Sequence, residues 1–226
     1  TKLIVLGGNG SFNALKIFSQ EFDISVVGIP ATIDNDIYES SYTLGVDTAL
    51  NVIKNALDDI RNTSSSSKRA FVVETMGRDF GYLAAVSAIT SGAEICLIPE
   101  VKIDYESLEK KLKKEIKNGR DYILALVSEG TKQTEELALW IQTNLKMQTR
   151  KIVLGHLQRG GNPSVFERRM ANEFVVYSID KLRKEKMKSA IVYKNCKFKF
   201  IDLETISNKK QVLNKKIIKQ LEHMVK

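Results

Sequence analysis

The sequence predicts an α/β fold in which the strands of a parallel sheet alternate with helices. Short apolar runs recur along the chain of 226 residues, and each has a length that suits one buried strand. Amphipathic stretches, with apolar residues three and four positions apart, separate these runs. Glycine-rich or polar clusters follow most of the runs, where a strand would end. This alternation is typical of strand–helix–strand units around a parallel sheet.

The predicted elements follow one another along the chain. Strands are expected at 3–6, 24–29, 70–73, 95–98, 122–127 and 151–155. Helices are expected where apolar residues line one face, namely Phe12, Leu15 and Phe18; Val46, Leu50, Ile53, Leu57 and Ile60; Leu108, Leu112 and Ile116; and Phe174, Tyr177 and Leu182. The serine-rich stretch 62–69 is predicted to be a polar loop after the second of these helices.

The chain is basic, with a formal net charge of +8 and a pI near 9.3. Lysines crowd 110–117, 182–188 and 209–219 among leucine and isoleucine at helical spacing, which predicts solvated helix faces. A basic protein also suits small anionic ligands. The sequence contains no motif for binding RNA or DNA, so a nucleic-acid-binding role is not favoured.

The composition also bears on the compartment. No run approaches the ~18 apolar residues that a membrane span needs. The first residues, TKLIVLGGNG, lack the arrangement of a signal peptide. The two cysteines, Cys96 and Cys196, are therefore expected to be reduced thiols in a cytoplasmic protein.

The first cluster that indicates chemistry is GGNGS at 7–11, which follows a predicted strand and opens a predicted helix. Glycines let the backbone approach a phosphate closely, and a helix start offers free N–H groups to an anion. Gly8, Asn9, Gly10 and Ser11 are therefore candidate phosphate-binding residues. A tight turn between a strand and a helix, with no ligand, would give the same pattern.

The second cluster, PATIDND at 30–36, carries two acids just after a buried strand. In an extended segment Asp34 and Asp36 would lie on one side, roughly 6–7 Å apart, with Thr32 offering a hydroxyl. One carboxylate would accept a proton from a substrate hydroxyl, and the other would help to hold Mg²⁺. A capped turn that leads into the next helix is the alternative.

Further clusters again follow predicted strands. They are ETMGRDFG at 74–81, VSEG at 127–130 and LGHLQRGGNPS at 154–164. Arg78 lies between two glycines, and His156 and Arg159 precede a glycine turn, an arrangement that suits a phosphate monoester. Ligands of parallel sheets gather beyond the carboxyl ends of the strands. The clusters together predict an anionic, phosphorylated substrate beside an acid–base pair.

The motifs PATIDNDI, ETMGRDFGYLA, VSEG and VLGHLQRGGNPS, in this order, resemble 6-phosphofructokinase of the bacterial type from about residue 3 to residue 180. The resemblance implies two doubly wound α/β domains that interleave in sequence, with the active site in the cleft between them. A nucleotide-binding domain, truncated at its N-terminus, would comprise 1–45 and 158–208. A sugar-phosphate and effector domain would comprise 46–157 and 209–226.

The resemblance implies ATP-dependent phosphorylation of fructose 6-phosphate to fructose 1,6-bisphosphate, a step of glycolysis, with Mg²⁺ as the cofactor. Asp34 would be the general base, Thr32 would contact the transferring region, and Arg78 would neutralise charge on the transferred group. Residues 8–11 would bind ATP. Asp36 would lie near the magnesium. The remaining sugar-phosphate residues would be Met76, Gly77, Glu129, His156 and Arg159, with Arg69 and Arg150 donated across a subunit interface.

Oligomerisation and regulation are also implied by the resemblance. Members of the family are homotetramers with an allosteric site for a nucleotide diphosphate or phosphoenolpyruvate. Arg61, Glu94, Gly119 and Arg120 match positions of that site. Asn118 and Tyr122 depart from the lysine and histidine that are common there.

Three departures from the family pattern concern the phosphoryl donor. The chain begins after the upstream strand–helix units that carry most of the family's ATP site. Asn9 replaces a metal-binding aspartate, and Ala31 replaces a glycine. The pyrophosphate-dependent branch has a lysine at the position of Ala31 and an acid at that of Gly10, so the pattern favours ATP. A fragment that only binds sugar phosphate and a pyrophosphate-dependent enzyme stay as alternatives.

Overall fold

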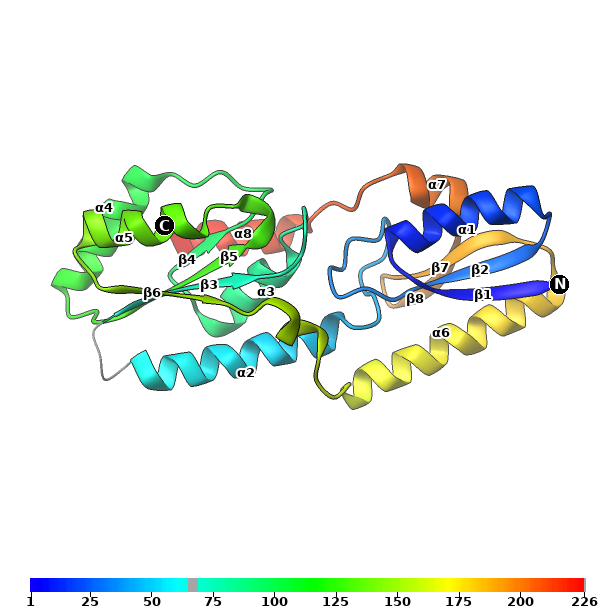
Figure 1. Ribbon diagram of the computed structural model, residues 1–226, viewed down its shortest axis with the longest axis horizontal. Coiled ribbons are helices and arrows are strands. Elements are labelled where there is room, and N and C mark those ends of the chain that lie inside the picture. The colour runs from blue at the N-terminus through cyan, green and yellow to red at the C-terminus, as the bar shows by residue number, and fades with distance from the viewer. Residues whose placement is uncertain (65–68, 226) are drawn as a thin grey trace. The chain divides into compact units, whose positions relative to one another are not determined.

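The computed structural model describes residues 1–64 and 69–225, and it divides into two compact units. The first unit comprises Thr1–Thr48 and Asn162–Val212, and the second comprises Ala49–Gly161 and Leu213–Lys226. Each unit therefore joins two separate stretches of sequence. Each also has its own sheet and its own apolar core (Figure 1). The predicted α/β class is confirmed.

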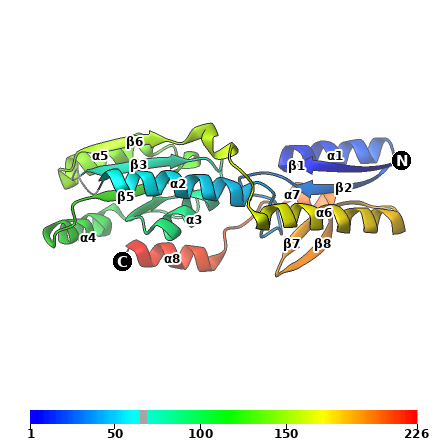
Figure 2. The same ribbon diagram turned by 90° about the horizontal axis from the view of Figure 1, so that it is seen from below.

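The sheet of the first unit has the strand order β1-β2-β7-β8. β1 (Lys2–Gly7), β2 (Ser25–Pro30) and β7 (Lys188–Lys194) are parallel, and β8 (Lys197–Asp202) is antiparallel to β7. Two helices, α1 (Asn9–Glu21) and α7 (Leu203–Asn208), pack together on one face, and α6 (Val165–Lys184) covers the other (Figures 1 and 2). Because helices cover both faces, every residue of β2 is buried.

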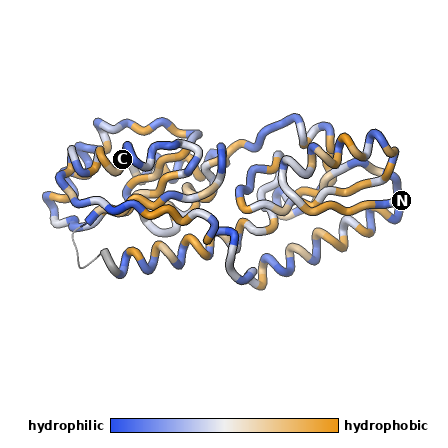
Figure 3. Tube along the Cα trace, in the orientation of Figure 1, coloured by the Kyte–Doolittle hydropathy of each residue, from blue (hydrophilic) through white to orange (hydrophobic). Residues whose placement is uncertain are grey.

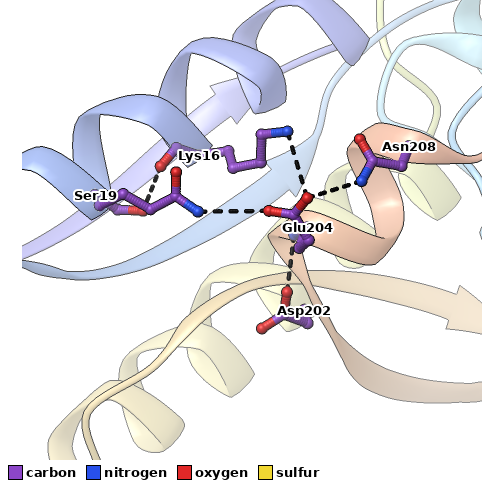
Figure 4. Close-up of polar contacts among 6 residues, drawn as sticks. Lys16, Ser19, Asp202, Glu204 and Asn208 are labelled. Atoms are coloured by element: carbon purple, nitrogen blue, oxygen red, sulfur yellow. Dashed lines mark hydrogen bonds and ion pairs between the residues drawn. The ribbon is translucent and has the colours of Figure 1, made fainter.

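A polar network fastens α7 to α1 within this unit. Glu204 of α7 accepts a hydrogen bond from Asn208 at 2.8 Å and forms an ion pair with Lys16 of α1 at 3.9 Å (Figure 4). The side chain of Asp202 caps α7 by accepting from the Glu204 N–H at 2.8 Å. Leu203 is fully buried in the core that α7 shares with α1.

The sheet of the second unit has the order β4-β5-β3-β6 and is parallel throughout. Its strands are β3 (Ala70–Thr75), β4 (Ile95–Leu97), β5 (Ile123–Ser128) and β6 (Thr149–Val153). The short helices η1 (Glu129–Thr131) and η2 (Gly155–Arg159) follow β5 and β6 directly. The carboxyl ends of these strands therefore lead into the segments that carry the candidate site residues.

Helices complete the second unit. α4 (Tyr105–Lys117) and α5 (Thr134–Leu145) bury their apolar residues against the sheet, whereas α3 (Tyr82–Ser91) and α8 (Lys215–Val225) pack together beside β4. α2 (Val46–Ser64) begins in the first unit and continues in the second. None of the helices among the described residues is long and apolar enough to cross a membrane.

The apolar runs of the sequence form the interior strands of both sheets (Figure 3). All the predicted strands are confirmed as β1 to β6, with ends that differ by at most two residues. The predicted helices are confirmed as α1, α2, α4 and α6. On α6, however, Tyr177 is 50% exposed, and Ser178 takes the buried position between Phe174 and Leu182. The helix turns 100° per residue, so i+4 rather than i+3 stays on the buried face here.

Two predictions about the chain's course need correction. The lysine-rich stretches 182–188 and 209–219 were expected to be helix faces, but α6 ends at Lys184, β7 begins at Lys188 and α8 begins only at Lys215. The polar loop expected at 62–69 starts later than expected, because α2 continues to Ser64. Residues 65–68 of that loop lie outside the described part.

The two cysteines have opposite environments. Cys96 of β4 is buried, and burial raises the pKa of its thiol to about 12. Cys196 is exposed in the tight turn between β7 and β8. Asn195 and Cys196 both have positive φ, 52° and 58°, which suits the right-handed twist of a two-residue hairpin turn. Both thiols are free.

Candidate functional site

The candidate general base lies in an irregular segment, residues 31–45, that follows β2. Asp34 is only 2% exposed. Its backbone N–H donates to the Thr32 hydroxyl oxygen at 3.3 Å, and that hydroxyl donates to Asp34 Oδ2 at 3.4 Å. The segment is not extended, because Asn35 has φ 55° and reverses the chain between the two acids. The expected extended spacing of Asp34 and Asp36 is therefore wrong, although the structure keeps Thr32 and Asp34 together.

Side-chain hydrogen bonds hold this segment in one conformation. The buried hydroxyl of Thr43 donates to the Thr32 carbonyl at 2.6 Å and to Asn35 Oδ1 at 3.2 Å. The Asn35 amide in turn donates to the Ser41 carbonyl at 3.3 Å. At the start of the segment, the Ala31 N–H donates to the Gly7 carbonyl at 2.9 Å. The two halves of the segment are thus fastened to each other and to the end of β1.

The glycine turn at 7–11 lies against the same segment. A Cβ on Gly8 would lie 3.4 Å from the Thr32 Cβ, so the turn passes close to that side chain. Asn9, the first residue of α1, donates its amide to Asp36 Oδ2 at 2.8 Å. Gly10 and Ser11 follow in the first turn of α1. The structure therefore brings together the predicted phosphate-binding turn and the predicted acidic pair.

Magnesium is the metal that the family implies, and Asn9 and Asp36 are the residues here that test it. Asp36 Oδ1 is buried with no hydrogen-bond partner, which fits one ligand position on a cation. Asn9 does not fit in the same way, because its NH₂ group points to Asp36 and brings no negative charge. No group of three or more His, Cys, Asp or Glu side chains within 1–64 and 69–225 forms a metal site. Asp36 therefore fits a metal that takes its other ligands from phosphate and water.

In the second unit, Met76, Gly77 and Arg78 follow β3 and are held by Glu129. One oxygen of Glu129 accepts the Gly77 N–H at 3.2 Å and the Arg78 N–H at 2.9 Å. Gly77 and Arg78 have φ 136° and 52°, so this turn uses the left-handed region twice. Glu129 is thus tied to the Arg78 backbone, and the predicted arginine and glutamate lie together.

His156 and Arg159 lie in η2 and are both exposed. The fully buried Gln158 between them fastens η2 to the end of β3. Its Oε1 accepts the Met76 N–H at 3.1 Å, and its Nε2 donates to the Gly155 carbonyl at 3.0 Å. The cluster at 154–164 therefore adjoins the cluster at 74–81, because β6 pairs with β3 in parallel.

Arg69 and Arg150 lie at the other end of this sheet. Arg69 precedes β3, and Arg150 is the second residue of β6, whereas Met76 and Arg78 follow the carboxyl end of β3. Six residues of strand span about 20 Å. The two arginines therefore do not join Arg78 within this chain. Arg69 instead donates to the Gln148 side chain at 2.8 Å.

Two of the expected effector residues, Glu94 and Arg120, line a cavity of about 220 Å³ together with Glu115 and Lys111. Arg120 forms ion pairs with Glu94 and, at 2.8 Å, with Glu115. Burial raises the pKa of Glu94, while the Leu124 N–H and Arg120 oppose that shift. Arg61 lies nearby, since a Cβ on Gly92 would be 4.0 Å from its guanidinium. Gly119 has φ 102° beside Arg120.

Replacing Arg120 by methionine is expected to destabilise the second unit by about 1–3 kcal/mol at neutral pH, because Glu94 would lose its cation. The pKa of Glu94 would rise further, and a raised carboxyl pKa costs stability only while the group is ionised. The loss should therefore be larger at pH 8 than at pH 5, as measured by urea unfolding. Lys110→Met is the control, since Lys110 pairs with Glu106 at 2.7 Å on an exposed face. An equal, pH-independent loss in both variants would contradict this assignment.

Several residues that organise the site were not among the candidates from sequence. Thr43 and Asn35 fold the acidic segment, Gln158 fixes η2, and Glu167 of α6 binds the end of the segment. Glu167 alone had a local signal, because Ser164 and Glu167 match the helix-start pattern S-x-x-E. The others are ordinary polar residues in an irregular segment or in the short helix η2, and no short sequence pattern distinguishes them.

Comparisons with known proteins agree with this architecture. The fold matches that of phosphofructokinase from Saccharomyces cerevisiae with a TM-score of 0.85 at 24% identity, over 99% of this chain and 34% of that chain. It also matches a pyrophosphate-dependent phosphofructokinase from Marinobacter aquaeolei with a TM-score of 0.82 at 18% identity, over 99% of this chain and 67% of that one. These structures define the class of protein as one with the phosphofructokinase fold.

The family model described as Phosphofructokinase matches residues 1–182, and the chain belongs to that family. It is 50% identical over 220 residues to the ATP-dependent 6-phosphofructokinase of Sulfurimonas denitrificans, covering 97% of this chain and 69% of the relative. It is 51% identical over 181 residues to the protein of the same name from Wolinella succinogenes, covering 80% of this chain and 57% of the relative. The chain thus spans 57–69% of the length of these relatives.

Proposed function

We propose that this chain acts in the ATP-dependent phosphorylation of fructose 6-phosphate to fructose 1,6-bisphosphate. The observation that supports the proposal most directly is the buried Asp34, hydrogen-bonded to Thr32, in a chain 50% identical to an ATP-dependent 6-phosphofructokinase. A buried carboxylate beside a hydroxyl suits proton transfer from an alcohol. The glycine turn that passes Thr32 suits the phosphates of the donor.

In the proposed reaction, Asp34 accepts the proton of the substrate's 1-hydroxyl. The hydroxyl oxygen attacks the γ-phosphorus of ATP, the bond from that phosphorus to the β–γ bridging oxygen breaks, and ADP leaves. Arg78 neutralises charge on the transferred group, because phosphoryl transfer depends mainly on positioning and charge neutralisation. Mg²⁺, held in part by Asp36, supplies further positive charge to the donor phosphates when it is bound.

The sugar phosphate is proposed to bind at the second unit through Met76, Gly77, Glu129, His156 and Arg159. The position of Arg69 and Arg150 at the amino ends of β3 and β6 supports their donation to a second copy, in a homo-oligomer. Two guanidinium groups suit a phosphate monoester because each presents several N–H donors. Gly8, Asn9, Gly10 and Ser11 are proposed to contact ATP, and the Glu94–Arg120 cavity is proposed to be the effector site.

Calorimetric titration of the chain with fructose 6-phosphate, beside a coupled assay with Mg²⁺-ATP, tests the proposal. Binding together with turnover is the expected result. Parallel assays with pyrophosphate in place of ATP test the alternative donor, and turnover with pyrophosphate alone would replace ATP in the proposal. If the chain neither binds fructose 6-phosphate nor turns it over, the proposed function is contradicted.

A second candidate function is binding of the sugar phosphate without catalysis. The hydrogen bond from the Asn9 amide to Asp36 favours it, because this bond occupies one oxygen that a cation would use. Its signature in the same experiment is binding of fructose 6-phosphate without turnover on either donor.

The Asn9→Asp variant is expected to bind divalent cations on the order of tenfold more tightly, because a second carboxylate replaces an amide donor beside Asp36. The affinity for Mn²⁺, measured by electron paramagnetic resonance, checks this without any need for turnover. Asn172→Asp is the matched control, since Asn172 is exposed on α6 of the same unit. Equal Mn²⁺ affinity in the two variants would show that Asn9 does not limit metal binding.

A further inference from the structure

We propose that Glu167, on α6, is a positioning residue that holds the 31–45 segment, and with it Asp34, in the geometry for proton transfer. The inference rests on the proposed function of Asp34. Glu167 lies far from Asp34 in sequence and carries no role in the reaction itself. Its carboxylate binds the second half of the segment, whose first half carries Thr32 and Asp34.

The carboxylate of Glu167 is 4% exposed and accepts hydrogen bonds from three residues. Its Oε1 accepts the Tyr42 hydroxyl at 2.8 Å and the Gly45 N–H. Its Oε2 accepts the Thr48 N–H at 3.2 Å and the Thr48 hydroxyl. All these groups belong to the first unit. A buried carboxylate with this many donors has both of its oxygens fully hydrogen-bonded as acceptors.

The donors mark the place where the segment becomes a helix. Gly45 precedes the first residue of α2, and Thr48 lies in its first turn. The first N–H groups of a helix have no partner inside the helix and favour negative charge. Glu167 therefore caps α2 from a different helix. Its own N–H is bound by the Ser164 hydroxyl at 3.1 Å, which fixes the start of α6 as well.

The connection from Glu167 to Asp34 runs through hydrogen bonds within the 31–45 segment. Tyr42 and Gly45 flank Thr43, and the Thr43 hydroxyl donates to the Thr32 carbonyl and to Asn35. The Leu44 N–H donates to the Pro30 carbonyl at 2.9 Å. If the second half of the segment moves, the residues on both sides of Asp34 therefore lose their partners. A displacement of about 1 Å at a reacting group can cost on the order of 10²-fold in rate.

The test compares Glu167→Gln with Glu173→Gln, a change of the same kind one and a half turns further along α6. Glu173 is partly exposed and pairs with Arg169 at 3.6 Å, away from the segment. In Glu167→Gln the new NH₂ group would face the backbone N–H of either Gly45 or Thr48. Both groups are donors, and a backbone N–H cannot rotate away. Two measurements are made on each variant. The first is deuterium uptake in a peptide spanning 31–45, and the second is kcat and KM for fructose 6-phosphate with Mg²⁺-ATP.

The expected result for Glu167→Gln is a several-fold faster uptake in 31–45 and a fall in kcat of about 10- to 100-fold, with KM unchanged. Glu173→Gln should match the wild type in both. A purely structural role would lower the melting temperature without this split between kcat and KM. Uptake in 31–45 equal to that of Glu173→Gln, or full kcat despite faster uptake, would overturn the inference.

The two proposals fail separately, because deuterium uptake needs no turnover. If the wild type does not turn over, the proposed function fails, and uptake alone still decides whether Glu167 orders the segment. Tyr42→Phe serves if Glu167→Gln does not fold, since it removes one donor and keeps the carboxylate. Tyr42→Phe should show a smaller increase in deuterium uptake in 31–45 and a smaller fall in kcat. Unchanged uptake in Tyr42→Phe would also overturn the inference.

Discussion

The Asp34→Asn variant is expected to lose turnover of fructose 6-phosphate by about 10²- to 10⁴-fold in kcat, with little change in sugar-phosphate affinity. An amide has nearly the shape of the carboxylate but cannot take up the substrate's proton. The proposed sugar-phosphate residues Met76, Gly77, Glu129, His156 and Arg159 belong to the second unit, whereas Asp34 belongs to the first. Coupled assays give kcat, and calorimetric titration gives the affinity for fructose 6-phosphate.

Asp23→Asn is the matched control for this experiment. Asp23 belongs to the same unit but is exposed, and its carboxylate pairs with Lys188 at 3.1 Å. Its neutralisation should leave kcat unchanged, because exposed ion pairs contribute little. Near-normal turnover in Asp34→Asn would show that another group, or water, accepts the proton. Equal losses in both variants would mean that charge in this unit, rather than Asp34 itself, controls the rate.

The Gly130→Ala variant is expected to destabilise the second unit by about 3 kcal/mol. A Cβ at this position would lie 1.9 Å from the Arg78 carbonyl oxygen, which is a backbone atom and cannot rotate away. The turn at 77–78 or η1 would have to move, and Glu129 would lose its bonds to Gly77 and Arg78. Urea unfolding measures the loss, and kcat should fall with it because Arg78 is displaced.

Gly160→Ala is the control for Gly130→Ala, in the same unit and beside η2. Its backbone is extended, with φ −89°, and the nearest atom to an added Cβ is the Leu157 carbonyl oxygen at 3.4 Å. Unfolding free energy should change by less than about 0.5 kcal/mol. If Gly130→Ala lowers the unfolding free energy by no more than this, the 77–78 turn can shift at little cost, and its close approach to η1 does not contribute to stability.

The central strands β2, β3 and β5 could be predicted because they are buried on both faces. β2, β3 and β5 read as continuous apolar runs, since helices cover each sheet on both sides. Their order along the chain then placed the polar clusters at the carboxyl ends. Pairing itself was not predictable from the runs, and neither β7 nor the antiparallel β8 at the edge of its sheet was expected.

The β7–β8 hairpin was missed because no strand was predicted between the lysine-rich stretches at 182–188 and 209–219. In β8 the sequence KFKFID alternates between exposed lysines and half-buried phenylalanines, and this period of two is the signal that was overlooked. Phe198 shows why the alternation matters, because its ring contacts Phe174 of α6 at 5.0 Å. In a lysine-rich stretch, apolar residues at every second position therefore favour a strand over a helix.

The site was predictable in its clusters but not in its internal geometry. The sequence places Thr32, Asp34 and Asp36 correctly in one segment, where Thr32 and Asp34 are hydrogen-bonded. That Asn9 lies against Asp36 is seen only in the folded chain. The left-handed Asn35 reverses the segment, and Asn is one of the few residue types that adopts this conformation readily. Glu167 carries a capping signature for its own helix, yet its side chain caps α2 instead. Such long-range partners follow from packing, which no local pattern encodes.

Because Cys196 is exposed and Cys96 is buried, thiol labelling of the chain can measure local unfolding of the second unit. Thiol reagents attack the thiolate, so the exposed Cys196 in the first unit should react at once. Cys96, buried in the second unit with a pKa raised to about 12, reacts only when β4 becomes accessible. The slow phase of labelling at Cys96 therefore reports the opening rate of the second unit alone, without any introduced probe. A ligand that binds this unit would lengthen that phase in proportion to its occupancy.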